Sequence, residues 1–137
     1  MIFNEKILFS VITPTYNRAE KLKDCFLGLQ KQSFSNFEWL IIDDGSIDKT
    51  KSLVDKWKDK LNIKYYYQEN SGKPSAVNKG IINAKGKYFT VLDSDDIPVP
   101  DALRKLYSLL EESSAMTIAV GCLTKDKNNN IIGSNFP

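Results

Sequence analysis

Three aspartates, Asp93, Asp95 and Asp96, stand within four residues, directly behind the apolar run 88–92. Carboxylates brought together in a partly dry cleft repel one another and raise one another's pKa unless a cation or hydrogen-bond donors offset them. A divalent cation is the simplest such offset, and a site with only oxygen ligands favours magnesium or manganese over zinc. The spacing therefore predicts a cation-binding loop at the end of a buried strand.

The elements that must position this loop follow a repeating order of apolar run and amphipathic segment. Asn17 and Glu20 have the spacing of a capping box, and Pro74 suits a first helical turn before Gly86 ends that helix. Strands alternating with helices predict an α/β fold with a mainly parallel sheet flanked by helices on both faces. We expect strands at 7–13, 37–42, 63–67 and 88–92, helices with apolar faces at 22–29, 53–61, 77–84 and 103–110, a last apolar run at 116–123 and a turn at 128–130.

Polar residues gather where each expected strand ends, at 13–17, 43–46, 68–73 and 93–96. Ligands of parallel α/β sheets bind in the crevice beyond the carboxyl ends of the strands. Asp43, Ser46 and Asp48 each also have a structural explanation as helix caps. Four such clusters at one edge favour a binding site over a set of unrelated caps.

Composition excludes several classes of function. The chain has 137 residues, 19 basic and 17 acidic side chains and no histidine, so it has no nucleic-acid footprint and no histidine-based acid or base. Cys25 and Cys122 form no metal-ligand pattern and suggest a reducing compartment. The first residues predict a strand and not a signal, and no apolar stretch approaches the roughly 18 residues of a membrane span. The segment 71–75 lacks the first glycine of a phosphate loop and has Pro74 at its magnesium-binding position, which argues against P-loop chemistry.

A nucleoside diphosphate held through a metal remains as a ligand class. Tyr16, after the first expected strand, could stack on a base. Asp44 could accept the N–H of a uracil imide, a donor that cytosine does not offer at that position.

Several segments in this order resemble glycosyltransferase family 2, which has the GT-A fold, a Rossmann-like fold of nucleotide-diphospho-sugar transferases. Each segment is a weak signal alone, and their order and spacing make the resemblance specific. They are FSVITPTYN at 9–17, WLIIDDGS at 39–46, NKG at 78–80, AKGKY at 84–88 and LDSDD at 92–96 with Pro100.

The resemblance implies a pocket for the base at one end of the site. Pro14 and Tyr16 would shape this pocket, and Asp44 would bind the uracil of a UDP-sugar. Asp43 is then expected to hold the loop. Thymidine carries the same imide as uridine, so both nucleotides stay open.

At the other end the resemblance implies that Asp93, Ser94 and Asp95 are the family's DXD motif. Asp93 would face the ribose and contribute to the metal site, and Asp95 would ligate Mn²⁺ or Mg²⁺ beside the diphosphate. Asp96 would lie behind these ligands or replace one of them. Lys73 would neutralise a phosphate, with an ordinary surface lysine as the alternative.

The implied reaction is an inverting transfer of the sugar to an acceptor hydroxyl, with the metal as Lewis acid. The family's general base follows the DXD segment, and nothing after Leu123 resembles it. We therefore expect residues 1–137 to form a single donor-binding domain that is truncated before the acceptor-binding part. The acceptor would be a saccharide or a lipid-linked saccharide, and the location cytoplasmic, peripheral at the inner membrane face.

Two other classes stay in view. A metal-dependent phosphotransfer domain also places aspartates at strand ends, but a receiver domain needs its acidic pair after the first strand, where this chain has Thr13, Pro14 and Thr15. A dehalogenase-like phosphatase needs a threonine where Ile97 stands. The non-enzymatic alternative is a nucleotide-binding module without turnover.

Overall fold

Four parallel strands form the central sheet, in the order β3-β2-β1-β4. The computed structural model describes residues 6–114 and 124–132. The strands are β1 (Phe9–Thr15), β2 (Phe37–Asp43), β3 (Ile63–Tyr67) and β4 (Tyr88–Val91). Each lies within two residues of its expected position, because β-branched and aromatic runs bounded by polar loops mark buried strands clearly.

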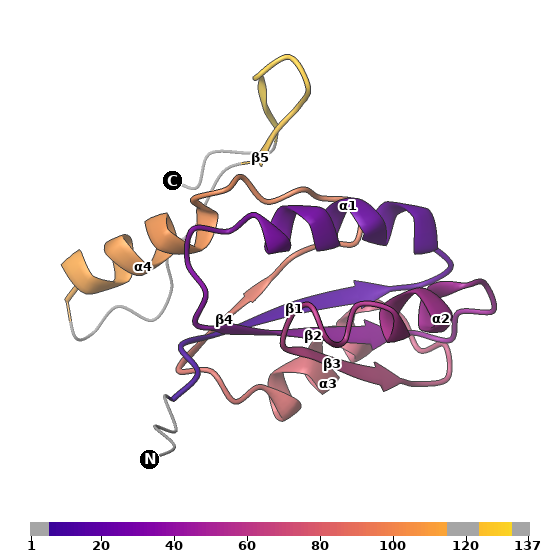
Figure 1. Ribbon diagram of the computed structural model, residues 1–137. Helices are drawn as coiled ribbons and strands as arrows, with labels where there is room; N and C mark the ends of the chain where they lie inside the picture. Colours follow the sequence, from indigo (N-terminus) through magenta and orange to yellow (C-terminus); the bar gives the residue numbers. More distant parts are fainter. Residues whose placement is uncertain (1–5, 115–123, 133–137) are drawn as a thin grey trace. The chain divides into compact units, whose positions relative to one another are not determined.

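Helices cover both faces of this sheet, as the alternating pattern predicted (Figure 1). The helices α1 (Ala19–Gln30), α2 (Thr50–Asp55) and α3 (Lys73–Asn83) connect successive strands, and α1 and α3 lie over opposite faces. Among the described residues, no helix is both long and apolar enough to cross a bilayer.

Alternate residues of β2 supply the two halves of the core. Leu40 and Ile42 pack with Ile12 and with Ala76 of α3. On α3, Gly80 comes so close to β1 that an added Cβ would clash with the side chain of Ile12.

The opposite face is aromatic. Phe26 of α1 stacks on Trp57 with 4.4 Å between the ring centroids, and Trp39 of β2 lies 6.1 Å from Trp57. The indole Nε1–H of Trp39 donates to Thr13 Oγ1 at 2.8 Å, which satisfies a buried polar group. Trp57 thus belongs to the core, with 6% of its surface exposed.

The capping box predicted for α1 is wrong. Asn17 lies in the left-handed region with φ of 50°, and its Oδ1 accepts the N–H of Ile47. Asp48, from the loop before α2, instead accepts the N–H of Ala19 at 3.1 Å and also binds Thr50. Because the capping residue comes from a distant segment, no local spacing in the sequence could predict this cap. The cap also connects the loop after β1 to the loop after β2.

Two helical faces also differ from expectation. The α-helical part of the segment 53–61 ends at Asp55, and turns follow as far as Lys60. On α3 the buried residues are Ala76 and Gly80, whereas Ile81 is 39% exposed. The buried face of α3 is narrower than the apolar residues in its sequence predicted. Only small residues face the sheet where α3 comes closest to it.

The chain divides into two compact units, residues 1–101 and 102–137. The second contains α4 (Ala102–Glu112) and a hairpin of β5 (Thr124–Lys125) and β6 (Ile131–Ile132). The turn expected at 128–130 is confirmed, with Asn129 at φ of 65°. The apolar run predicted at 116–123 lies outside the described residues, and the single domain expected over 1–137 stays a prediction.

Candidate active site

A cavity of about 370 Å³ opens at the carboxyl edge of the sheet, within the unit 1–101. Pockets of roughly 300–1,000 Å³ hold small-molecule ligands. The cavity brings together residues from all four strand ends. They are Pro14, Thr15, Tyr16, Arg18, Asp44, Lys73, Asp93, Ser94 and Asp95. The residues predicted to bind the nucleotide or the metal all line it, except Asp96, the predicted alternative ligand. Their individual roles stay predictions.

The loop after β1 is fixed by its neighbour. The N–H of Asn17 donates to Ser46 Oγ at 2.8 Å, and Asn17 Oδ1 accepts the N–H of Ile47 at 2.8 Å. Pro14 and Thr15 belong to the buried strand, whereas Tyr16 is 49% exposed. A rigid loop thus presents an aromatic ring at the cavity with one side available to a ligand.

Asp44 is almost fully buried, with 5% of its surface exposed, and it is held by the loop before α3. Its Oδ1 accepts Gln68 Nε2 at 2.7 Å and the N–H of Ser71 at 2.8 Å, and its Oδ2 accepts the N–H of Gly72 at 2.9 Å. Burial alone would raise the pKa of Asp44, but these hydrogen bonds outweigh it and lower the pKa. Asp44 is therefore a stable anion at the cavity wall.

Asp43 holds the loop that begins after β2. Its Oδ1 accepts the N–H of Ser46 at 2.8 Å, and its Oδ2 accepts the hydroxyl of Tyr65 at 2.5 Å. The expectation that Asp43 fixes this loop is confirmed. Burial and the hydrogen bond to Asp43 raise the pKa of Tyr65, so this hydroxyl stays a donor.

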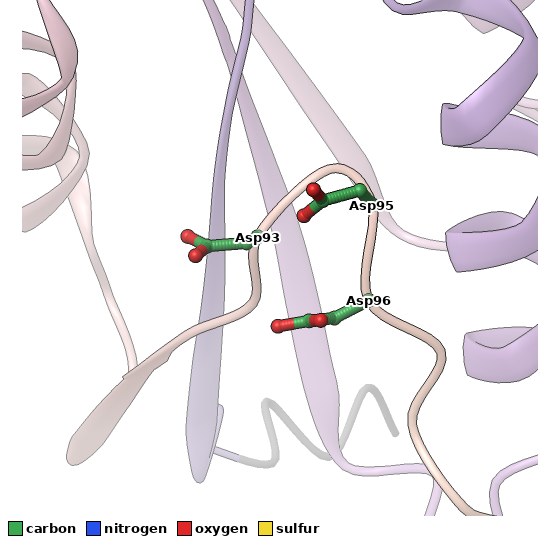
Figure 2. Close-up of side chains that lie close together, drawn as sticks. All are labelled: Asp93, Asp95 and Asp96. Carbon is green, nitrogen blue, oxygen red and sulfur yellow. The ribbon is translucent and has the colours of Figure 1, made fainter. Parts of the chain in front are cut away.

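Asp93, Asp95 and Asp96 project from one tight loop after β4, which we call the acidic loop (93–96; Figure 2). One carboxylate oxygen from each lies within 4.8 Å of the others. Burial, followed by the charges of Asp95 and Asp93, raises the pKa of Asp96. The donor set consists of hard oxygen atoms alone, so its chemistry fits Mg²⁺ or Mn²⁺.

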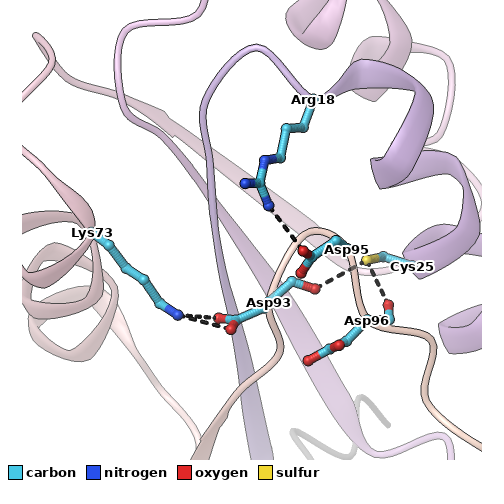
Figure 3. A network of polar contacts seen from close by, with 6 residues as sticks. All are labelled: Arg18, Cys25, Lys73, Asp93, Asp95 and Asp96. Atoms are coloured by element: carbon cyan, nitrogen blue, oxygen red, sulfur yellow. Dashed lines mark hydrogen bonds and ion pairs between the residues drawn. The ribbon is translucent and has the colours of Figure 1, made fainter. Parts of the chain in front are cut away.

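Two basic side chains reach the acidic loop from different elements (Figure 3). Lys73, the first residue of α3, places Nζ 2.7 and 2.8 Å from the two carboxylate oxygens of Asp93. Arg18, just before α1, places Nη1 3.2 Å from Oδ2 of Asp95. The sequence reasoning missed Arg18. The signal for it was its position directly behind the loop that follows β1.

Cys25 of α1 supports the acidic loop from beneath. Its Sγ lies 3.0 Å from the backbone oxygen of Asp96 and 3.4 Å from that of Asp93. Burial, together with the charge of Asp96, raises the pKa of this thiol to about 12, so it remains a donor. The thiol therefore orders the backbone of the loop whose carboxylates face the cavity.

A second cavity, of about 390 Å³, lies between α1 and the loop that follows the acidic loop. Its wall is mainly apolar and includes Leu27, Ile97, Pro98 and Val99. It contains none of the clustered charges, so of these two cavities in the described part of the chain the carboxyl-edge cavity is the candidate active site.

Comparison with known proteins agrees with this geometry. The sequence model described as Glycosyl transferase family 2 matches residues 10–135. Glycosyltransferase GlyG of Streptococcus pneumoniae is 37% identical over 110 residues, which cover 79% of this chain and 36% of GlyG. The chain thus spans about a third of the length of this curated relative.

Solved structures give the same answer. Residues 1–349 of S. aureus TarS, in complex with UDP-GlcNAc, superpose with a TM-score of 0.73 at 35% identity, over 77% of this chain and 31% of that TarS chain. The mannosyltransferase PcManGT of Pyrobaculum calidifontis, in complex with GDP-Man and Mn²⁺, superposes with a TM-score of 0.75 at 24% identity, over 92% of this chain and 38% of that one, a likeness that concerns the fold. These likenesses show the GT-A fold, and the chain belongs to glycosyltransferase family 2.

Proposed function

We propose that this chain binds the donor of an inverting glycosyltransferase, which transfers a sugar from a nucleoside diphosphate, with UDP as the leading candidate, to an acceptor hydroxyl. The observation that carries the proposal is the set of side chains that share the carboxyl-edge cavity. The half-exposed ring of Tyr16 and the carboxylate of Asp44 line it together with two basic residues, Arg18 and Lys73, and with Asp93 and Asp95. A nucleotide-sugar combines the matching parts, an aromatic base and a charged diphosphate.

At the base end, Asp44 has the capacity for one further bond. A carboxylate offers about four lone-pair sites, and the loop before α3 uses three of them. A uracil or thymine imide N–H would take the fourth, while the exposed ring of Tyr16 would stack on the base. The UDP-GlcNAc complex of TarS supports the choice of a uridine donor.

At the diphosphate end, Asp95 and Asp93 would hold Mn²⁺ or Mg²⁺, with Asp96 close enough to contribute. Lys73 and Arg18 are the groups that would bind phosphate oxygens. The cation, when bound, supplies Lewis-acid stabilisation of the charge on the departing diphosphate. The protein residues orient the diphosphate beside the acidic loop and fix the direction in which the leaving group departs.

The reaction breaks the bond between the anomeric carbon and the diphosphate oxygen and forms a bond from that carbon to the acceptor oxygen, with inversion. The acceptor's proton goes to a carboxylate base that we place outside residues 1–137. The acceptor we propose is a saccharide, free or lipid-linked. The proposals for the general base and for the acceptor both concern the part of a full-length family 2 enzyme that residues 1–137 do not cover.

Isothermal titration of UDP tests the donor site directly. We expect UDP to bind in the presence of Mn²⁺, and Asp95→Asn to weaken that binding at least roughly tenfold, because a charged ligand of the cation is lost. Asp59→Asn, an exposed aspartate after α2 that does not line the cavity, is the matched control and should bind as the wild type does. Absence of UDP binding with and without Mn²⁺ would refute the proposal.

A further inference from the structure

We propose that Arg18 is an exchangeable counter-cation of the acidic loop. It pairs with Asp95 in the ligand-free site and moves to the diphosphate when nucleotide and metal bind together. Arg18 therefore opposes the binding of metal alone and favours the binding of metal with nucleotide. This inference rests on the proposed function, since it requires a diphosphate donor and a divalent cation.

The first argument is position. Arg18 and Lys73 come from different elements, and Figure 3 shows them approaching the acidic loop from two sides. Each is paired with one of the two aspartates that would hold the cation, Arg18 with Asp95 and Lys73 with Asp93. Both basic residues also line the cavity. They stand where a metal would compete with them for oxygen atoms and where a diphosphate would meet them.

The second argument is charge. The three carboxylates of the acidic loop and the two basic side chains leave one net negative charge. A divalent cation alone would turn this into a net positive charge, and the diphosphate of a nucleotide-sugar alone would add two negative charges. Both ligands together restore the charge of the ligand-free site. The net charge of the acidic loop and its two counter-ions is therefore the same, one negative charge, with neither ligand or with both, and each ligand alone shifts it.

The third argument is that the exchange costs little. The side chains of Arg18 and Asp95 are 51% and 50% exposed, and such exposed pairs are weak and screened by solvent. A guanidinium binds carboxylate and phosphate with the same fork of donors. Arg18 can therefore leave Asp95 for a phosphate without losing the type of interaction it makes.

The inference predicts effects of opposite sign for one substitution. Arg18→Gln frees Asp95, so it should tighten the binding of Mn²⁺ alone roughly two- to fivefold, the range of a lost exposed ion pair. The same substitution removes a phosphate ligand, so it should weaken UDP binding at saturating Mn²⁺ about tenfold. A residue that merely supports the fold would weaken both.

The experiment consists of two titrations of the full chain. Electron paramagnetic resonance measures free Mn²⁺ without UDP, and isothermal titration measures UDP binding at saturating Mn²⁺. Lys21→Gln, on the exposed face of α1, is the control for the general loss of one positive charge. Arg18→Lys should retain the wild-type affinity for Mn²⁺ alone but lose part of the gain from UDP, because an ammonium lacks the fork. Thermal melting verifies that each variant is folded.

If Arg18→Gln leaves the affinity for Mn²⁺ alone unchanged or lowers it, or matches Lys21→Gln in both titrations, the exchange is refuted while the donor site stands. If the wild type binds neither UDP nor Mn²⁺, the proposed function and this inference are both overturned. The two failures are therefore distinguishable in one set of titrations.

Discussion

Glu38 and the aspartates of the acidic loop are carboxylates near opposite ends of the strands, and they are held in opposite ways. Glu38, the second residue of β2, is fully buried, and its Oε1 accepts the hydroxyl of Ser10 at 2.6 Å and the N–H of Lys85 at 2.7 Å. Asp93 and Asp95 are paired with Lys73 and Arg18, whose long side chains are half exposed.

This difference distinguishes two kinds of carboxylate. We call a carboxylate structural where it accepts hydrogen bonds inside the fold, and exchangeable where it pairs with a mobile basic side chain. A backbone donor is fixed in place and cannot follow another ligand, whereas Lys and Arg side chains can rotate to one. Glu38 joins β1, β2 and the segment before β4, because Ser10 also accepts the N–H of Gly86. Asp44 combines the two types, since it is held by fixed donors and still lines the cavity.

The largest effect should come from Glu38→Ala. It leaves the N–H of Lys85 and the buried hydroxyl of Ser10 without their acceptor and creates a cavity. We expect the free energy of unfolding to fall by about 3–4 kcal/mol. Urea denaturation measures this loss, and UDP affinity below the transition should be unchanged because Glu38 does not line the site.

Two further variants sharpen this result. Glu38→Gln keeps an acceptor oxygen for both bonds and should cost clearly less than Glu38→Ala. Glu20→Ala removes an exposed carboxylate that pairs with Lys23 and should change stability by less than about 0.5 kcal/mol. A loss of UDP affinity in folded Glu38→Ala would contradict the division into structural and exchangeable carboxylates.

Asp44→Asn should affect both stability and binding. An amide offers one acceptor oxygen where three donors converge, so we expect a loss of about 2 kcal/mol in the free energy of unfolding. UDP affinity should fall roughly tenfold, because the imide N–H would meet an amide that is less basic than a carboxylate. Denaturation and titration of the same sample measure the two effects.

The pH dependence of Asp44 has a definite sign. Its pKa is lower in the folded state than in the unfolded chain, so its stabilising effect is complete above the usual carboxyl pKa of about 3.9 and is lost as the pH falls through the folded value. The wild type should therefore lose more stability than Asp44→Asn between pH 5 and acid conditions. If the free energies of unfolding of the two proteins fell equally as the pH is lowered, the hydrogen bonds to Asp44 would not stabilise its charge.

The strands and the carboxyl-edge cluster could be read from the sequence because both depend on short patterns. An apolar run such as 37–43 followed by polar residues marks a strand end, and parallel strands bring their carboxyl ends together whatever the details of packing. The acidic loop, Asp44 and Lys73 were therefore found together. The narrow buried face of α3 was missed because it depends on how closely Gly80 approaches Ile12.

Contacts over long sequence separation were also missed, for a related reason. Asp48 caps α1 from 29 residues away, and Arg18 meets Asp95 across the site. Neither partner has an unusual sequence neighbourhood, so local spacing favoured the capping box of Asn17 instead. Cys25 likewise looked like an ordinary core residue until its thiol was seen beneath the acidic loop.

The smallest effect, and the sharpest contrast with Glu38, should come from Asp96→Asn. The pKa of Asp96 is raised by burial and by Asp95 and Asp93, so its ionisation destabilises the ligand-free fold as the pH rises through that raised value. Removing the charge should increase the free energy of unfolding at pH 7 by a few tenths of a kcal/mol, a figure limited by solvent screening, and should give no gain near pH 3.

Urea denaturation at the two pH values measures this change in stability, while the affinity for Mn²⁺ with UDP should fall. A loss of more than about 1 kcal/mol at pH 7, the size expected for a buried unsatisfied group, would place Asp96 with Glu38 as a structural carboxylate and break the distinction between the two ends of the sheet.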